Sequence, residues 1–426
     1  MTMYYSKHYL EKACSAYDAM DEFRNKRERL VRFSFGDQWS DEVPDFDGSK
    51  ISEGELFKRD GKYIVSVNLI RRVIRMLVGR FRSQWRSSYD PSPTSIDGRN
   101  ALYDLDSRLL EEFIISGCAI QRIVAERRPE GSGVWIDNVD PRRFFVNSIT
   151  DPRGCDIDFI GVITDYSWPR FLNRFSKGKA GKAEELRAVF DANCSRRIVV
   201  DEWTSQPTIQ LFELWSYEPV TYRHKRLEVE MRWVSRHIAP DGTVVLQKTS
   251  DFPHQSHPFA VKFYPLVNGQ IHSYVEDLID RQKAINRMLT TFEATIATAA
   301  KGVLLFPQCQ LLKGITYDDI AALWARPDSV IPIAGGDELP HQLITNANAT
   351  GIVPIVDMQL KLFDEASGMT DVLRGGGLPG NIDSESRKAL IDNAATSVTD
   401  ILDTFKSFID FRNAKAAQTL SGEVKA

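Results

Sequence analysis

The sequence predicts an α+β protein in which helices and strands share the first two thirds and long helices dominate the last third. Long segments near both ends carry apolar residues at three- and four-residue spacing, which is typical of amphipathic helices. The segment 134–264 instead holds short runs rich in β-branched and aromatic residues, separated by turns such as Pro240-Asp241-Gly242. At 426 residues the chain exceeds the usual size of a single core, so we expect two or three substructures.

The composition excludes some classes of function. Apolar residues make up 42% of the chain and charged residues 26%, as in ordinary globular proteins. The formal net charge is -4, whereas proteins that coat nucleic acid by bulk electrostatics are strongly basic. Any contact with DNA must therefore be local or weak.

The cysteines and the N-terminus indicate a soluble product of the cytoplasm. No two cysteines form a CxxC pair, so we expect reduced and mostly buried thiols at all five positions, Cys14, Cys118, Cys155, Cys194 and Cys309. The first residues lack the apolar stretch of a signal peptide. No apolar run approaches the ~20 residues that span a bilayer.

Two helices are expected before the strand region, over 6–32 and 68–86, with a loop at 40–61 between them. The second helix has an arginine face next to its apolar stripe, formed by Arg71, Arg75, Arg82 and Arg86. A row of like charges is usually a solvated or salt-bridged face. The alternative is a subunit interface or a contact with phosphate.

The strand region is interrupted by one helical insert at 168–192. The runs that read as strands are 134–139, 142–147, 196–203, 208–215, 226–234 and 259–266. Aromatic residues fall mainly at core-facing positions of these runs, which favours core packing over stacking on bases. This region completes an α+β body.

A long helix over 273–302 follows, opened by the capping box Ser273-x-x-Glu276 and closed by Lys301-Gly302. At 1.5 Å per residue it is about 40 Å long, so it must pack along something equally long. Gln282 occupies a position of its stripe where an apolar residue is due. The other stripe residues are Val275, Leu278, Ile285, Leu289, Phe292 and Ile296.

A small module at 303–350 separates this helix from a second one at 351–367, in which Pro354 suits a helix start. The loop 368–384 then precedes a helix over 385–413 and a polar tail. Glycines 375–377 give the loop unusual conformational freedom, and Arg374 is the cation available there for a phosphate. The loop residues of interest are Asp371, Arg374, Gly375, Gly376, Gly377 and Asn381. The alternative is a surface linker without a ligand.

At this point the chain resembles the portal proteins of tailed bacteriophages and prophages, in particular those of short-tailed phages. The order of the matching motifs carries the resemblance, together with the sequence of helix, small module, helix, loop and helix. The motifs are Gly36-Asp37-Gln38-Trp39; Asn68, Leu77, Gly79 and Arg82; Val139-Asp140-Pro141 with Phe145-Val146 before Asp151-Pro152; Asp280, Gln282, Ile285, Asn286 and Arg287; and Ser367-Gly368 with Leu373-Arg374-Gly375.

The resemblance implies a ring subunit with the parts of a portal. Residues 1–272 and 385–413 would form the wing, 273–302 and 351–367 the two stem helices, 303–350 the clip, and 368–384 the tunnel loop facing DNA. The tail 414–426 would leave almost no crown, which is a departure from the short-tailed type; either the crown is nearly absent or the C-terminus is shortened.

The resemblance also implies partners and a place in the virion. The subunit would form a homo-oligomeric ring, usually a dodecamer, at one capsid vertex among the major capsid protein. It would dock the terminase large subunit during packaging and head–tail adaptor proteins later, while double-stranded DNA passes through without sequence specificity. We expect no enzymatic activity, cofactor or metal.

The sequence lacks the common enzyme signatures. No GxxxxGK[ST], GxSxG or HExxH occurs, which excludes the packaging ATPase itself on sequence grounds. Paired aspartates resemble the acids of metal-dependent nucleases only weakly, at Asp45 with Asp47 and at Asp156 with Asp158. We expect solvated loop histidines rather than metal ligands at His254, His257 and His272. The remaining alternatives are a head–tail adaptor and a metal-dependent DNA-processing enzyme.

Overall fold

The computed structural model describes residues 4–128, 131–176, 181–196, 198–199, 207–223, 227–250, 256–301, 303–325, 330–335, 338–343, 349–369 and 384–423. The α+β prediction is confirmed, with half of the chain in helices and about a quarter in strands. The chain forms two compact units, the first made of Met1–Gly36, Leu69–Ile279 and Ser367–Ala426, the second of Asp37–Asn68 and Asp280–Ala366. In the described part, no helix is long and apolar enough to cross a membrane.

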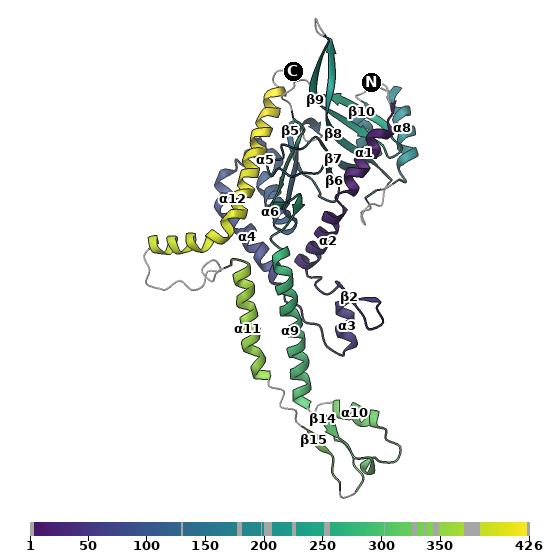
Figure 1. The fold of residues 1–426 in the computed structure, drawn as a ribbon, viewed down its shortest axis with the longest axis vertical. Coiled ribbons are helices and arrows are strands. Elements are labelled where there is room, and N and C mark those ends of the chain that lie inside the picture. The colour runs from purple at the N-terminus through teal and green to yellow at the C-terminus, as the bar shows by residue number, and fades with distance from the viewer. Residues whose placement is uncertain are drawn as a thin grey trace. The chain divides into compact units, whose positions relative to one another are not determined.

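The first unit is built on a six-stranded antiparallel sheet (Figure 1). In spatial order its strands are β1 (Tyr4–Tyr5), β10 (Thr243–Thr249), β9 (Leu227–Ile238), β8 (Thr208–Arg223), β7 (Phe159–Ser167) and β6 (Phe144–Val146). A second sheet of three strands has the order β11 (Phe259–Phe263), β4 (Cys118–Arg128) and β5 (Gly131–Asn138). The register of the large sheet sets Val162, Glu213 and His237 side by side across three strands.

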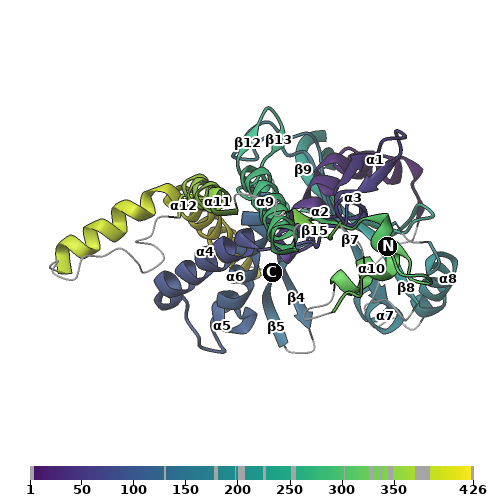
Figure 2. The same cartoon turned by 90° about the horizontal axis from the view of Figure 1, so that it is seen from below.

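Helices cover both sheets of the first unit. Their bounds are α1 (Lys7–Asp18), α2 (Asp21–Phe35), α4 (Leu69–Trp85), α5 (Ile96–Asn100), α6 (Leu102–Ser116), α7 (Trp168–Ser176), α8 (Gly181–Asn193) and α12 (Ser384–Glu423). Helix α1 packs on one face of the large sheet, and the small sheet packs on the other. Helices α6 and α12 contact the small sheet, while α7 and α8 lie side by side near β8 (Figure 2).

The aromatic residues of the sheets form the core, as predicted. Phe145 contacts Phe159 and Phe212 beneath α1, and Phe144 contacts Phe259 between the two sheets. All five of these rings are fully buried. Burial of each large apolar side chain contributes ~1.5–3 kcal/mol relative to leaving it exposed.

Several predicted boundaries were wrong. The helix expected over 6–32 is two helices, because the chain turns at Ala19-Met20 before Asp21 opens α2. The insert at 168–192 is likewise two helices, α7 and α8. The strand expected at 196–203 is a bend at Ile198 and Val199, with most of the run outside the described residues. Strands β4, β7 and β10 were missed.

The second unit contains a hairpin and a short helix where a loop was expected over 40–61. The strands β2 (Glu42–Pro44) and β3 (Lys50–Ser52) pair, and α3 (Glu53–Arg59) follows directly. Ser52 caps α3 through a complete capping box with Glu55. This cap was overlooked because the segment is rich in Asp, Gly and Ser.

The second unit also holds most of the helix–module–helix segment. Its elements are α9 (Glu276–Lys301, whose first turn belongs to the first unit), β14 (Val303–Leu305), α10 (Tyr317–Ala325), β15 (His341–Leu343) and α11 (Ala349–Ala366). Strands β14 and β15 pair antiparallel and close the module. Pro354 lies inside α11 rather than at its start.

Helix α12 is longer than predicted. It begins at Ser384 and continues to Glu423, so the segment 414–423 is helical rather than a polar tail. The extension is anchored by side chains that a hydropathy pattern does not identify as buried, Arg412 and Lys415.

Candidate functional site

A ladder of buried polar side chains runs along α9 at four-residue spacing. Gln282 donates from Nε2 to the carbonyl of Val67 at 2.7 Å, and Asn286 Oδ1 accepts from the Val67 amide at 3.2 Å. One turn later, Thr290 Oγ1 accepts from the amide of Val65 at 3.1 Å. The helix therefore pairs with the backbone of an extended segment, much as a neighbouring strand would. This explains why Gln282 interrupts the apolar stripe.

The same ladder joins two of the motifs that carry the portal resemblance. Asn286 donates from Nδ2 to Gln38 Oε1 at 2.6 Å. Gln38 belongs to Gly36-Asp37-Gln38-Trp39, and both amide side chains are buried. The two motifs are thus parts of one polar core in the second unit.

A charged cluster continues this core. The buried Glu53 carboxylate lies 2.9 Å from Lys283 Nζ and also pairs with Arg287. Lys283 reaches Asp41 at 3.0 Å as well. Burial alone would raise the pKa of Glu53, but hydrogen bonds from Arg287 and Lys283 outweigh it and hold the pKa below its ordinary value. Arg287, one of the α9 residues on which the portal resemblance rests, thus holds α3 in place.

The predicted stripe of the long helix becomes more exposed along its length. The first four positions are buried: Val275, Leu278, Gln282 and Ile285. Leu289 and Phe292 are half-buried, and Ile296 is 45% exposed. The Ser273 hydroxyl accepts from the Glu276 amide at 3.0 Å, which forms the first half of the expected capping box.

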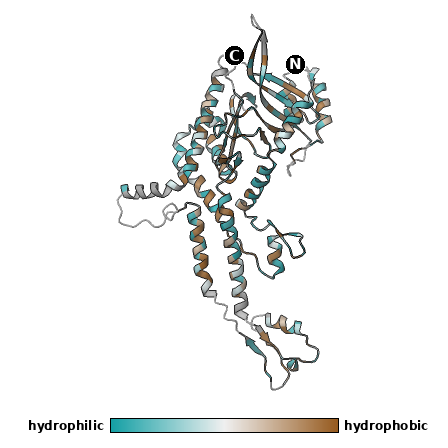
Figure 3. Ribbon diagram, in the orientation of Figure 1, coloured by the Kyte–Doolittle hydropathy of each residue, from teal (hydrophilic) through white to brown (hydrophobic). Residues whose placement is uncertain are grey.

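Helix α11 exposes several apolar side chains. Val353, Ile355 and Met358 are 48%, 44% and 50% exposed. Figure 3 shows apolar colour along most of the helix. Near its end, Phe363 is fully buried, so only part of the helix is covered within the chain.

The arginine face of α4 is divided between paired and exposed side chains. Arg71 pairs with Glu111 and lies over the ring of Phe35. Arg82 reaches Asp104 at 2.8 Å. Arg75 and Arg86 are exposed, and the described residues offer them no acceptor. The structure does not gather the four into one site.

The glycine-rich loop falls outside the described residues. This applies to Asp371, Arg374, Gly375, Gly376, Gly377 and Asn381. Before the gap, Gly368 adopts a left-handed backbone that ends α11, and Met369 is buried.

Two of the aspartates considered for enzyme chemistry make structural contacts. Asp156 Oδ2 accepts from the amides of Thr150 and Asp151, which fixes the turn before β7. Asp45 pairs with Arg59 beside the β2–β3 hairpin. Within the described ranges, no group of three or more His, Cys, Asp or Glu could hold a metal ion.

The three histidines have separate surroundings. His257 is partly buried, with its ring against Trp233, rather than solvated in a loop, and burial lowers its pKa well below the ordinary value. His272 lies 3.5 Å from Glu276, and His254 is outside the described part. All five cysteines are free thiols, but Cys155 and Cys309 are exposed, contrary to the expectation of mostly buried thiols.

Sequence reasoning missed a buried charge network in the first unit. Arg412 of α12, 1% exposed, reaches Asp106 from Nη2 at 2.9 Å and Gln121 from Nη1 at 3.1 Å. Lys415, one turn later, donates to the carbonyl of Phe259 at 2.7 Å. No local signal could have identified these partners, because they lie far away in the sequence.

Comparisons with known proteins add no relative: no protein-family model matches the chain, and no curated protein does.

Proposed function

We propose that this chain is the subunit of a ring-shaped portal of a tailed bacteriophage or prophage. In this role α9 and α11 are the stem helices, the module between them is the clip, and the glycine-rich loop faces DNA in the channel. The ring would serve genome packaging and ejection, dock the terminase large subunit and later the head–tail adaptors, and perform no chemistry itself.

The exposed apolar side chains of α11 carry the proposal. A helix with apolar residues around most of its circumference needs partners on several sides. Within one chain, Val353, Ile355 and Met358 remain about half exposed. In a ring, a neighbouring copy would cover them, since every copy presents the same surface to the next.

The position of the resemblance motifs supports the same proposal. Gln38 and Asn286 come from motifs 248 positions apart and bond directly. Together with Glu53 and its two cationic partners they fasten α9 to the segment 37–68. A stem helix that packs against neighbouring subunits needs a fixed position within its own subunit, which these contacts provide. A head–tail adaptor would not need two long helices around a small module.

The charge of the chain suits DNA that must slide. Each phosphate neutralised by a protein cation adds salt-dependent affinity, which would resist translocation. A net charge of -4 limits such contacts. Arg374 of the glycine-rich loop would then make a single weak contact with a DNA phosphate and would not hold the DNA tightly.

The proposal is tested by the mass of the assembly in solution. We expect the wild-type chain to form a closed oligomer of about a dozen copies by native mass spectrometry. Val353→Asp with Met358→Asp should leave a folded monomer, because charges placed at a buried contact are not tolerated.

Val267→Asp is the matched control, since Val267 is 51% exposed on the hairpin β12 (Leu266–Val267)–β13 (Gln270–Ile271), which belongs to the first unit, whereas α11 belongs to the second. It should assemble like the wild type. A wild-type chain that stays monomeric across protein and salt concentrations would contradict the proposal. So would full assembly of the double α11 variant.

A further inference from the structure

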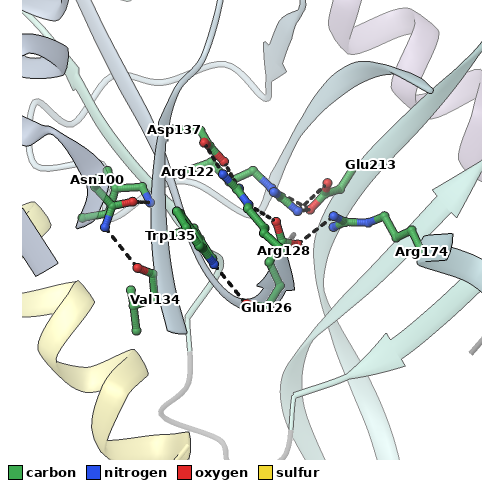
Figure 4. Close-up of polar contacts among 10 residues, drawn as sticks. Asn100, Arg122, Glu126, Arg128, Val134, Trp135, Asp137, Arg174 and Glu213 are labelled. Carbon is green, nitrogen blue, oxygen red and sulfur yellow. Dashed lines mark hydrogen bonds and ion pairs between the residues drawn. The ribbon is translucent and has the colours of Figure 1, made fainter. Parts of the chain in front are cut away.

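A large cavity lies within the first unit, between the large sheet, the β4–β5 hairpin and α7. Its volume is about 1480 Å³, which exceeds the ~300–1000 Å³ of ordinary small-molecule pockets. The large sheet contributes Tyr166, Glu213 and His237 to its lining. Figure 4 shows Arg122, Arg128 and Arg174 converging from the hairpin and α7 on Glu126 and Glu213. Nothing in the portal proposal uses this cavity.

The inner carboxylates of the cavity are already neutralised by arginines. Glu213 accepts from Arg122 at 2.9 Å. Glu126 accepts from Arg128 at 2.8 Å and from Arg174 at 2.7 Å. Arg128 also reaches Asp137 at 2.9 Å and lies over the ring of Trp135. These pairs hold the walls in place and neutralise three of the four lining carboxylates, and the fourth, Asp165, pairs with Arg143 outside the lining.

The rim of the cavity carries a surplus of positive charge. Six lysine and arginine side chains line the cavity against four carboxylates. The surplus comes from Arg127 of β4, Arg170 of α7 and Lys248 of β10, which are exposed. Within the described part of the chain, none of the three side chains has a hydrogen-bond or ion-pair partner. They stand on three different elements around the cavity, so a ligand with several anionic groups could contact all three.

The buried side chain of His237, which lines the floor of the cavity on the large sheet, has unsatisfied hydrogen-bonding groups. The imidazole is 5% exposed, and neither ring nitrogen has hydrogen-bond geometry to a described group. Glu213 Oε2 lies 3.5 Å from Nε2 and is already engaged by Arg122. A buried polar group without a partner costs about 1–3 kcal/mol, so such groups usually indicate a missing ligand or water. Burial lowers the pKa of His237 against the opposing effect of Glu213, and the neutral ring keeps one N–H to donate.

We propose that this cavity binds a polyphosphate group, either free or as part of a nucleotide. Arg127, Arg170 and Lys248 would each contact a different phosphate, and His237 would donate to an oxygen that reaches the floor. Arginine and lysine are the usual phosphate-binding side chains, through forked and point-charge contacts respectively. The site does not depend on ring assembly.

The test is a calorimetric titration of the purified full-length chain with sodium tripolyphosphate and, separately, with ATP, at low ionic strength. We expect saturable binding of one ligand per chain. Arg127→Gln with Arg170→Gln should weaken binding at least tenfold and leave the melting temperature unchanged, because both side chains are exposed. His237→Leu should also weaken binding, because it removes the N–H donor at the buried end of the cavity.

Arg108→Gln is the matched control, since its side chain is 78% exposed on α6 outside the cavity. It should bind like the wild type. Tighter binding of ATP than of tripolyphosphate would show that the base contributes; equal affinity would show that the phosphates suffice. The absence of saturable binding of both ligands to the wild type overturns the proposal, as does equal binding by the double variant.

Discussion

The largest fully buried side chain in the described structure belongs to Arg412. Its guanidinium reaches Asp106 and Gln121, and Asp106 also accepts from the Tyr89 hydroxyl at 2.9 Å. A buried ion pair adds little stability over an apolar pair of the same shape, but removing one partner leaves the other charge stranded. The network therefore fixes how α12 attaches to α6 and β4.

Arg412→Met should lower the free energy of unfolding by about 3–5 kcal/mol, because Asp106 remains buried without its cation. Chemical denaturation of the full-length chain measures this loss. Adding Asp106→Asn to the same chain should recover part of the loss. Equal stability of Arg412→Met and the wild type would show that the pair does not hold α12.

Lys415 makes stability depend on pH. Burial lowers the pKa of its ammonium from 10.5 to about 7. Between these values the unfolded chain binds a proton that the folded chain does not, so stability rises with pH by up to about 1.4 kcal/mol per pH unit. We expect the wild type to gain stability relative to Lys415→Met between pH 7.5 and 9.5. Parallel pH profiles of the two proteins would contradict this placement of Lys415.

The burial of Arg412 and its pairing with Asp106 could not be predicted from the sequence. Arg412 and Asp106 are 306 positions apart, and each has the pattern of an ordinary exposed charge in its own helix. Hydropathy assigns both to the surface. Only the packing of α12 against the small sheet brings them together.

At the scale of elements, α9 gives the clearest comparison. Its stripe and the capping contact of Ser273 were predictable from spacing and local sequence, although the helix itself begins at Glu276 rather than at Ser273. The role of Gln282 was not, because its partner is the backbone of Val67. The prediction of a loop over 40–61 was wrong for a related reason. The polar composition of this segment is typical of a loop, although it contains the capped helix α3.

Gln282→Leu restores an unbroken apolar stripe, yet we expect it to destabilise the protein. The carbonyl of Val67 would lose its donor, which costs about 1–3 kcal/mol for a buried group. Gln84→Leu, on an exposed face of α4, is the matched control and should change stability by less than about 0.5 kcal/mol. A Gln282→Leu protein more stable than the wild type would show that the ladder is not a structural requirement.

The glycine-rich loop is tested by shortening it. Deletion of 375–377 should leave ring assembly intact, because the stem contacts are elsewhere, and should reduce the DNA content of particles. Quantifying packaged DNA after complementation with the shortened protein checks this. Wild-type DNA content would remove the loop from the proposed mechanism, whereas loss of rings would assign it a role in assembly.

At the scale of the whole molecule, the α+β class and the helix–module–helix order could be predicted from the sequence. The division into two units could not, because each unit is assembled from segments far apart in the chain. The exposure of the apolar side chains of α11 could not be predicted either. A continuous apolar helix has the pattern of a core helix until its neighbours are known. That surface is the strongest structural reason to expect other copies.

The central claim is a ring with a channel, and imaging of the purified protein tests it most directly. Negative-stain electron microscopy under assembly-favouring conditions should show rings with a central hole of at least ~20 Å, the width of duplex DNA. A uniform population of monomers, or of closed particles without a hole, would contradict the account.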